Sequence, residues 1–209
     1  MRLLLLWKHV STEMGDPVTS QRMEAFSDGV LAIVITIMVL KLELPVDLDI
    51  SSLYLTAPTL LAYALSYIYV GIYWANHHHL AGVSKTISGS TLLKNLHWLF
   101  WITLIPVVTE WVGTHPFAPM PAMFYGVILF MCSVTYHFLQ RDIVRRLSHD
   151  DSGSLEWDRD LKGRISIIAY LIATTTAVFI PAVSYIIYAA IALIWLIPDT
   201  RLERLFGES

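Results

Sequence analysis

Six apolar stretches, separated by polar or proline-containing segments, follow one another between residues 22 and 197. The first four cover residues 22–44, 53–74, 92–112 and 122–139, and Pro181 divides the apolar run 165–197 into two shorter stretches. A helix of about 20 apolar residues crosses the hydrocarbon core of a bilayer, and proline stops helices and favours turns. The pattern predicts an all-α integral membrane protein: residues 22–197 form six transmembrane helices between a cytoplasmic lead, 1–21, and a cytoplasmic tail, 198–209.

The basic residues indicate how these six helices are oriented in the membrane. With six spans, 13 of the 14 Lys and Arg residues fall on the side that holds both termini and the loops 76–91 and 140–164, counting Lys94 just inside the third helix. Lys41 alone lies on the other side. Because short cytoplasmic loops collect Lys and Arg, we expect a multi-pass protein of the cell membrane with both termini in the cytoplasm.

Composition supports the membrane assignment and excludes several other classes. The chain is 56% hydrophobic and 15% charged, with a mean hydropathy of +0.59. These values exclude an ordinary soluble domain and a nucleic-acid partner bound through basic charge. Cys132 is the single cysteine and lies inside an apolar run, so the sequence offers neither a disulfide framework nor a thiolate metal site.

The first predicted helix has two different sides. At about 100° per residue, one side carries the residues Phe26, Gly29, Ile33, Thr36, Ile37 and Leu40. Ser27 and Asp28 point away from that side, near one mouth of the span, where a carboxylate is costly unless it has a partner. We expect them to join a structural polar network. The candidate partners at the same depth are Arg22, Trp74, His77 and Asn95, and a link from Asp28 to a protonated His77 would be especially favourable.

Several of these residues resemble a known family. Arg22, the run Phe26-Ser27-Asp28, Ala32-Ile33, Thr36 and Leu40 are similar to the first-helix signature of the endosomal/lysosomal potassium channel family. Weaker similarities follow in order at Trp74 and His77, at Leu92-Leu93 and Asn95, at Thr103 to Pro106, at Ile180-Pro181 and at Ser184-Tyr185. The resemblance is to the bacterial branch, and it implies a six-helix subunit that assembles as a homotetramer around a central pore.

The resemblance also implies where ions would pass. Periodicity alone favours ordinary helix packing for Ile33, Ile37 and Leu40. The resemblance reverses this preference, because family members line their pore with the matching positions. Rings of these side chains would make a hydrophobic constriction, with the Thr36 hydroxyl as a polar ligand for a partly dehydrated cation. The chain has no TVGYG filter. We therefore expect modest selectivity for potassium over sodium, based on the lower dehydration cost of the larger ion.

Other functions find less support in the sequence. The triplet His77-His78-His79 invites a metal site, but neighbouring helical residues point about 100° apart and cannot converge on one ion. No nucleophile with a base, Walker loop or Rossmann glycine pattern is present, so we expect no enzyme and no cofactor, with potassium only as the permeant ion. Two alternatives remain: an alternating-access membrane transporter and a non-conducting membrane scaffold.

Overall fold

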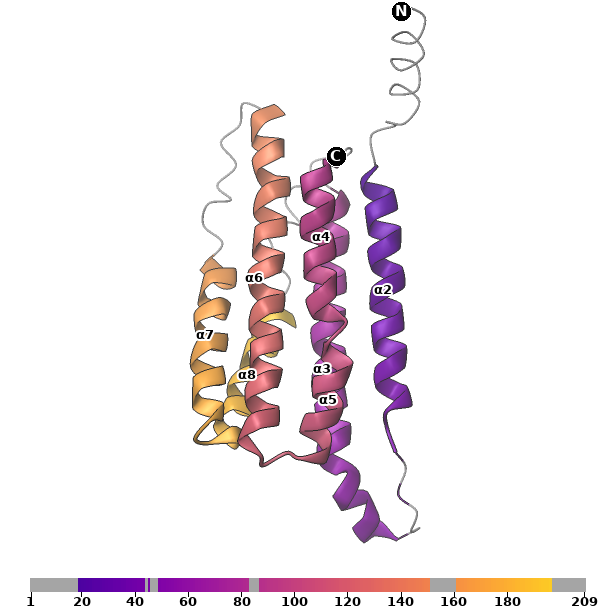
Figure 1. Cartoon of the computed structure of the whole chain (residues 1–209), viewed down its shortest axis with the longest axis vertical. Helices are drawn as coiled ribbons and strands as arrows, with labels where there is room; N and C mark the ends of the chain where they lie inside the picture. The colour runs from indigo at the N-terminus through magenta and orange to yellow at the C-terminus, as the bar shows by residue number, and fades with distance from the viewer. Residues whose placement is uncertain (1–18, 44, 46–48, 83–86, 151–160, 197–209) are drawn as a thin grey trace, which may run out of the picture.

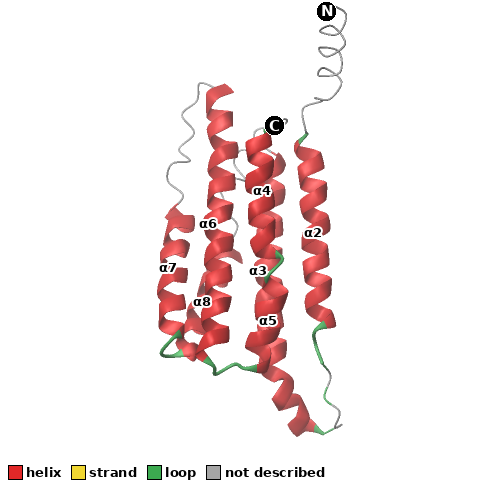
Figure 2. Cartoon of the chain, viewed as in Figure 1, coloured by secondary structure: helices red, strands yellow, loops and turns green. Residues whose placement is uncertain are grey.

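The structure is a computed structural model that describes residues 19–43, 45, 49–82, 87–150 and 161–196. Its regular elements within these residues are helices (Figures 1 and 2). In chain order they are α2 (Ser20–Leu40), α3 (Ile50–Gly82), α4 (Gly89–Ile102), α5 (Ile105–Thr114), α6 (Pro119–Asp150), α7 (Leu161–Ala177) and α8 (Pro181–Leu196). The expected all-α architecture is confirmed for this part of the chain. The predicted lead over 1–21 and the tail over 198–209 lie almost wholly outside the described residues.

The helices run up and down the long axis of the molecule, and α5 continues the pass that α4 begins (Figure 1). The α2 helix lies at one edge of the bundle and packs on α3, α4 and α5. The α6 helix contacts α4, α5, α7 and α8, and therefore joins the two parts of the bundle. As predicted from Pro181, a short turn separates α7 from α8, and this proline is the first residue of α8.

The third predicted span consists of two helices. The α4 helix ends at Ile102 and α5 begins at Ile105, with Pro106 in its first turn. A proline at this position cannot donate a backbone hydrogen bond to the carbonyl of residue 102. The backbone forms a tighter turn there, because the Leu104 N–H donates to the Trp101 carbonyl oxygen, three residues earlier, at 3.2 Å. Ile102 and Ile105 are both fully buried, so the break is packed inside the bundle.

Two helices extend well into segments that the sequence analysis assigned to polar loops. The α3 helix continues through the histidine triplet to Gly82, and α6 continues to Asp150. Ion pairs stabilise the polar end of α6, because Asp142 pairs with Lys94 of α4 and with Arg146 one turn along its own helix. Asp142 also accepts a hydrogen bond of 2.6 Å from the Thr91 hydroxyl. Such charge pairs satisfy polar side chains where a helix leaves the membrane core, and hydropathy does not reveal them.

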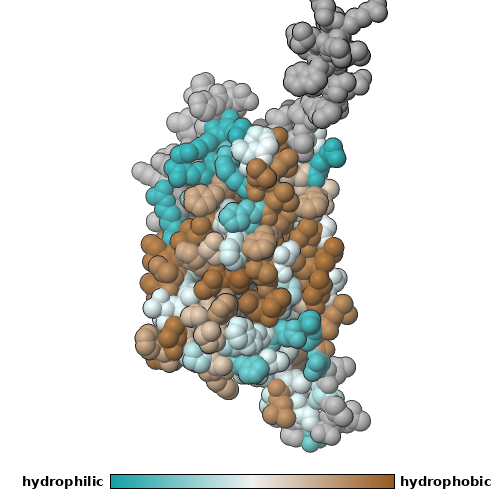
Figure 3. All heavy atoms as spheres, viewed as in Figure 1, coloured by the Kyte–Doolittle hydropathy of each residue, from teal (hydrophilic) through white to brown (hydrophobic). Residues whose placement is uncertain are grey.

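Four helical stretches of the described chain are long and apolar enough to cross a membrane, and they are Ser20–Leu40, Tyr54–Gly82, Gly89–Thr114 and Pro119–Arg146. The α8 helix is a shorter apolar helix. In Figure 3 apolar side chains form a band across the middle of the visible face, and polar side chains gather toward its upper end. The structure therefore has the surface of a membrane-embedded helical bundle.

Close packing between α3 and α5 depends on the absence of a side chain at Gly113. A Cβ atom added at Gly113 would lie 2.8 Å from the Cα atom of Thr59, whereas one added at Gly71 would meet nothing within 4 Å. We predict that Gly113→Ala destabilises the protein by about 1–3 kcal/mol, because the contact is with backbone that cannot rotate away. The matched variant Gly71→Ala should leave the melting temperature unchanged or raise it. Equal melting curves for both variants in detergent would contradict this account of the α3–α5 contact.

Candidate pore helix and its anchors

The α2 helix has one side buried in the helical bundle and one side exposed. The buried residues are Ser20, Met23, Ser27, Leu31, Val34 and Met38. The exposed side holds the predicted stripe, with exposed fractions of 55% for Phe26, 58% for Ile33, 42% for Ile37 and 81% for Leu40. Thr36 is exposed as well, and its hydroxyl donates to the Ile33 carbonyl oxygen at 2.8 Å. The free lone pairs of this hydroxyl are therefore available as acceptors on the exposed side.

A buried chain of hydrogen bonds holds the other side of α2 against α3 and α4. The amide nitrogen of Asn95 donates to the Ser27 hydroxyl at 2.9 Å, and this hydroxyl donates to the Met23 carbonyl oxygen at 2.8 Å. The amide oxygen of Asn95 lies 2.9 Å from Nε2 of His77. Since the amide oxygen can only accept, Nε2 carries the proton. We call His77, Asn95 and Ser27 the anchor chain; all three side chains are buried.

The environment of His77 suits a neutral ring. Its Nδ1 atom is buried and has no hydrogen-bond partner among the described residues. The ring stacks on Trp98 with 5.0 Å between centroids and 9° between planes. A proton added at Nδ1 would be a buried donor without an acceptor. The expected network joining Asp28 to a protonated His77 is not formed by hydrogen bonds among the described residues, in which Asp28 bonds Trp74 and His77 bonds Asn95.

Asp28 instead joins a second, more exposed set of contacts between α2 and α3. Its carboxylate accepts the Trp74 indole N–H at 3.1 Å. One turn away, Glu24 pairs with Nδ1 of His78 at 2.5 Å, and the Trp74 and His78 rings stack. Two carboxylates one turn apart on α2 thus face two partners one turn apart on the antiparallel α3. These contacts offset the repulsion that the spacing of Glu24 and Asp28 would otherwise cause.

Arg22 does not join this arrangement. Its side chain is exposed, and it makes no hydrogen bond or ion pair with any residue that the structure describes. At the C-terminal end of α2, Lys41 forms an ion pair with Glu110 of α5, with 3.1 Å between the ammonium nitrogen and a carboxylate oxygen. The sequence pattern did not predict this pair. Both residues stand out in the sequence as charges at the ends of apolar spans. Their pairing depends on which helices are neighbours, and this a single sequence does not show.

The histidine triplet does not form a metal centre. His77 is buried in the anchor chain, His78 pairs with Glu24, and His79 is exposed. Within the described residues, no group of three or more His, Cys, Asp or Glu side chains is placed to hold a metal ion. The three neighbouring histidines therefore have three different environments around α3.

The anchor chain makes a specific prediction for stability. Asn95→Leu keeps a similar volume but leaves the His77 Nε2–H buried without an acceptor, which costs about 1–3 kcal/mol. We expect a lower melting temperature in detergent and a lower yield of purified protein. Asn76→Leu is the control, because among the described residues the Asn76 side chain bonds the Ile72 carbonyl oxygen of its own helix and no side chain of another helix. A wild-type melting temperature for Asn95→Leu would contradict the anchoring role.

Known proteins share both sequence and fold with this chain. The family profile described as endosomal/lysosomal potassium channel TMEM175 matches residues 22–106. A potassium channel of Chryseobacterium sp. (strain P1-3) is 46% identical over 192 residues, which cover 92% of this chain and 100% of that relative. The endosomal/lysosomal proton channel TMEM175 of Rattus norvegicus is 31% identical over 137 residues, and the match covers 63% of this chain but 26% of that protein.

A solved structure has the same arrangement of helices. It is the crystal structure of a lysosomal potassium-selective channel TMEM175 homolog from Chamaesiphon minutus, with a TM-score of 0.72 and 24% sequence identity. The superposition covers 85% of this chain and 96% of that chain, so the two share a fold. Together with the relative that is 46% identical over its whole length, this similarity shows that the chain belongs to the endosomal/lysosomal potassium channel TMEM175 family.

Proposed function

We propose that the chain is one subunit of a homotetrameric potassium channel in which four copies of α2 line a central pore. The observation that carries this proposal is the exposed stripe of Ile33, Ile37 and Leu40 on a helix whose other side is fixed by buried polar contacts. Family membership supports it, and the bacterial relative that matches over its whole length is named a potassium channel. In this proposal each subunit crosses the cell membrane six times, with α4 and α5 forming one crossing.

Small residues on α2 favour a contact with other copies of the chain over a surface that faces only lipid. Ala25, Gly29 and Ala32 are exposed beside the apolar stripe. A Cβ atom at Gly29 would meet nothing within 4 Å, so packing inside the subunit does not require a glycine there. Small residues let helices approach closely in membranes. On this side of α2, the small residues would let the α2 helices of neighbouring subunits pack closely around an axis.

The stripe would act as a hydrophobic constriction in such an assembly. Rings of Ile33, Ile37 and Leu40 oppose the entry of water and hydrated ions, and such rings can gate by dewetting. The exposed Thr36 hydroxyl, which donates to its own helix, would offer its lone pairs to a partly dehydrated cation. Hydrophobic rings do not coordinate ions, so the preference for potassium over sodium would rest on dehydration cost and would be modest.

The membrane orientation follows from the charges. With six crossings, both termini would lie in the cytoplasm, on the side that collects 13 of the 14 Lys and Arg residues. Glu24, Asp28 and the anchor chain would then lie at the cytoplasmic mouth of the pore. The Lys41–Glu110 pair would mark the opposite surface.

A transporter is the strongest alternative because α4 and α5 form a broken span, and transporters build substrate sites at such breaks. Here the break is lined by the buried apolar residues Ile102 and Ile105, and no Asp, Glu, Lys or Arg occurs between Asn95 and Thr109, where His97 is the single titratable side chain. Planar-bilayer recording of the purified protein separates the possibilities. Unitary currents would support the channel. Slow, saturable ion flux would support a transporter, and the absence of any current or flux would support a scaffold.

The pore assignment predicts a change in selectivity for one substitution. In Ile33→Asn, polar side chains replace a hydrophobic ring, which lowers the dehydration barrier that separates the two ions. We expect larger currents and a permeability ratio of potassium to sodium that moves toward one, measured from reversal potentials in mixed solutions. The control is Ile168→Asn on α7, because Ile168 is 59% exposed against 58% for Ile33 and lies on the far part of the bundle.

Two outcomes would count against this assignment. An unchanged permeability ratio in Ile33→Asn would remove Ile33 from the constriction. An equal shift in Ile168→Asn would show that the effect comes from a polar group in lipid and not from the pore.

A further inference from the structure

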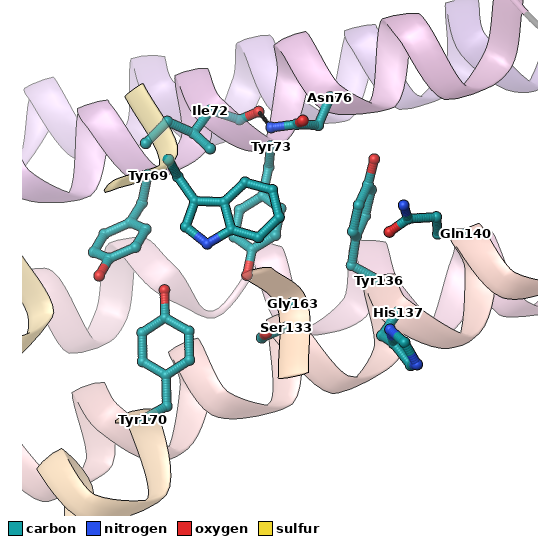
Figure 4. A pocket seen from close by; sticks show the side chains of 11 residues that line it. Tyr69, Ile72, Tyr73, Asn76, Ser133, Tyr136, His137, Gln140, Gly163 and Tyr170 are labelled. Carbon is teal, nitrogen blue, oxygen red and sulfur yellow. Dashed lines mark hydrogen bonds between the residues drawn. The ribbon is translucent and has the colours of Figure 1, made fainter. Parts of the chain in front are cut away.

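A small cavity lies inside the subunit, away from the proposed pore helix. Its volume is about 30 Å3, and it lies between α3, α6, α7 and α8 (Figure 4). Residues of α2 do not line it. A water molecule needs roughly 10–15 Å3 of such space, so the cavity has room for about two.

Polar groups reach the cavity from several helices. In Figure 4 the hydroxyls of Tyr69 and Tyr170 point toward each other at one end, and the Tyr136 side chain extends toward Asn76 at the other. Between them Tyr73 extends from α3 toward Ser133 of α6 and the backbone at Gly163 of α7. Most of the lining surface is apolar and comes largely from aromatic rings, but hydroxyl and amide groups are also part of it. A bound water needs such polar partners.

Tyr73 supplies the decisive observation. Its side chain is only 8% exposed, yet its hydroxyl has no hydrogen-bond partner among the described residues. The Ser133 hydroxyl, which faces the same cavity, likewise has none within the described part of the chain. Tyr73 is buried and Ser133 is half-buried, and both residues line the cavity. An occupant that can both donate and accept hydrogen bonds would give each hydroxyl a partner.

We propose that this cavity is a binding site for about two water molecules, one of which is held by Tyr73 and Ser133. Water fits the volume, and it satisfies hydroxyls that act as donors or as acceptors. The lining side chains include no carboxylate to balance a bound cation. The volume also lies far below that of a lipid acyl chain. The proposal does not depend on the identity of the permeant ion.

The bound water would support the anchor chain through an aromatic stack. The Tyr73 ring lies 5.9 Å from the Trp98 ring, and Trp98 stacks on His77 at 5.0 Å. Tyr73 also meets Tyr136 edge to face at 5.7 Å. Water that holds the Tyr73 hydroxyl would therefore fix the ring against which the Trp98 and His77 pair is packed. The cavity is lined by α7 and α8 and also by α3, which contacts α2 directly.

Radiolytic hydroxyl-radical labelling of the full-length protein in lipid nanodiscs tests the proposal, because ionised bound water labels the side chains next to it. We expect millisecond X-ray exposure to oxidise Tyr73, as read by mass spectrometry. Tyr125 should remain unlabelled, because it is also buried and its hydroxyl is hydrogen-bonded to Ser66 outside the cavity. A structure at a resolution that shows water should have density between Tyr73 and Ser133.

Two variants make the outcome decisive. Ser133→Val fills the space with methyl groups and should reduce labelling of Tyr73 to the level of Tyr125, whereas Ser133→Ala leaves the space open and should retain labelling. The proposal is overturned by an unlabelled Tyr73 in the wild type, by equal labelling in all three proteins, or by elongated lipid density in the cavity.

Discussion

The position of α2 depends on one buried chain of hydrogen bonds. His77 donates to Asn95, Asn95 donates to Ser27, and Ser27 donates to a carbonyl oxygen of its own helix. These three hydrogen bonds form together at one depth and one rotation of α2. Another register would break these hydrogen bonds and leave Ser27 or Asn95 buried without a partner. The rotation fixed in this way is the one that exposes Ile33.

The subunit divides into two regions with different tasks. On one side of the bundle, α2 is attached by polar contacts at both ends and leaves its apolar stripe exposed. On the other side, α3, α6, α7 and α8 surround an aromatic core with a small cavity. Trp98 lies between them, in contact with both His77 and Tyr73. In the proposed channel, this aromatic core would support the anchor chain that holds α2 in place.

Hydrophobic periodicity was sufficient to place the apolar helices and to assign the two sides of α2, because burial in a bundle follows helical spacing. It also placed Ser27, Trp74 and Asn95 at a common depth, where the structure brings them into contact with α2 or with each other. The pairing of Glu24 with His78 could not be predicted, since it depends on which antiparallel neighbour α2 has. The cavity beside Tyr73 depends on packing geometry that a sequence pattern does not encode.

The central claim is that the fixed rotation of α2 turns its apolar stripe toward a symmetry axis shared by several subunits. A cryo-electron microscopy structure of the assembled protein in lipid nanodiscs tests this claim most directly. The account predicts four subunits, with Ile33, Ile37 and Leu40 closest to the axis and no lipid between the copies of α2. Lipid acyl chains packed on these residues, with another helix nearest the axis, would contradict it.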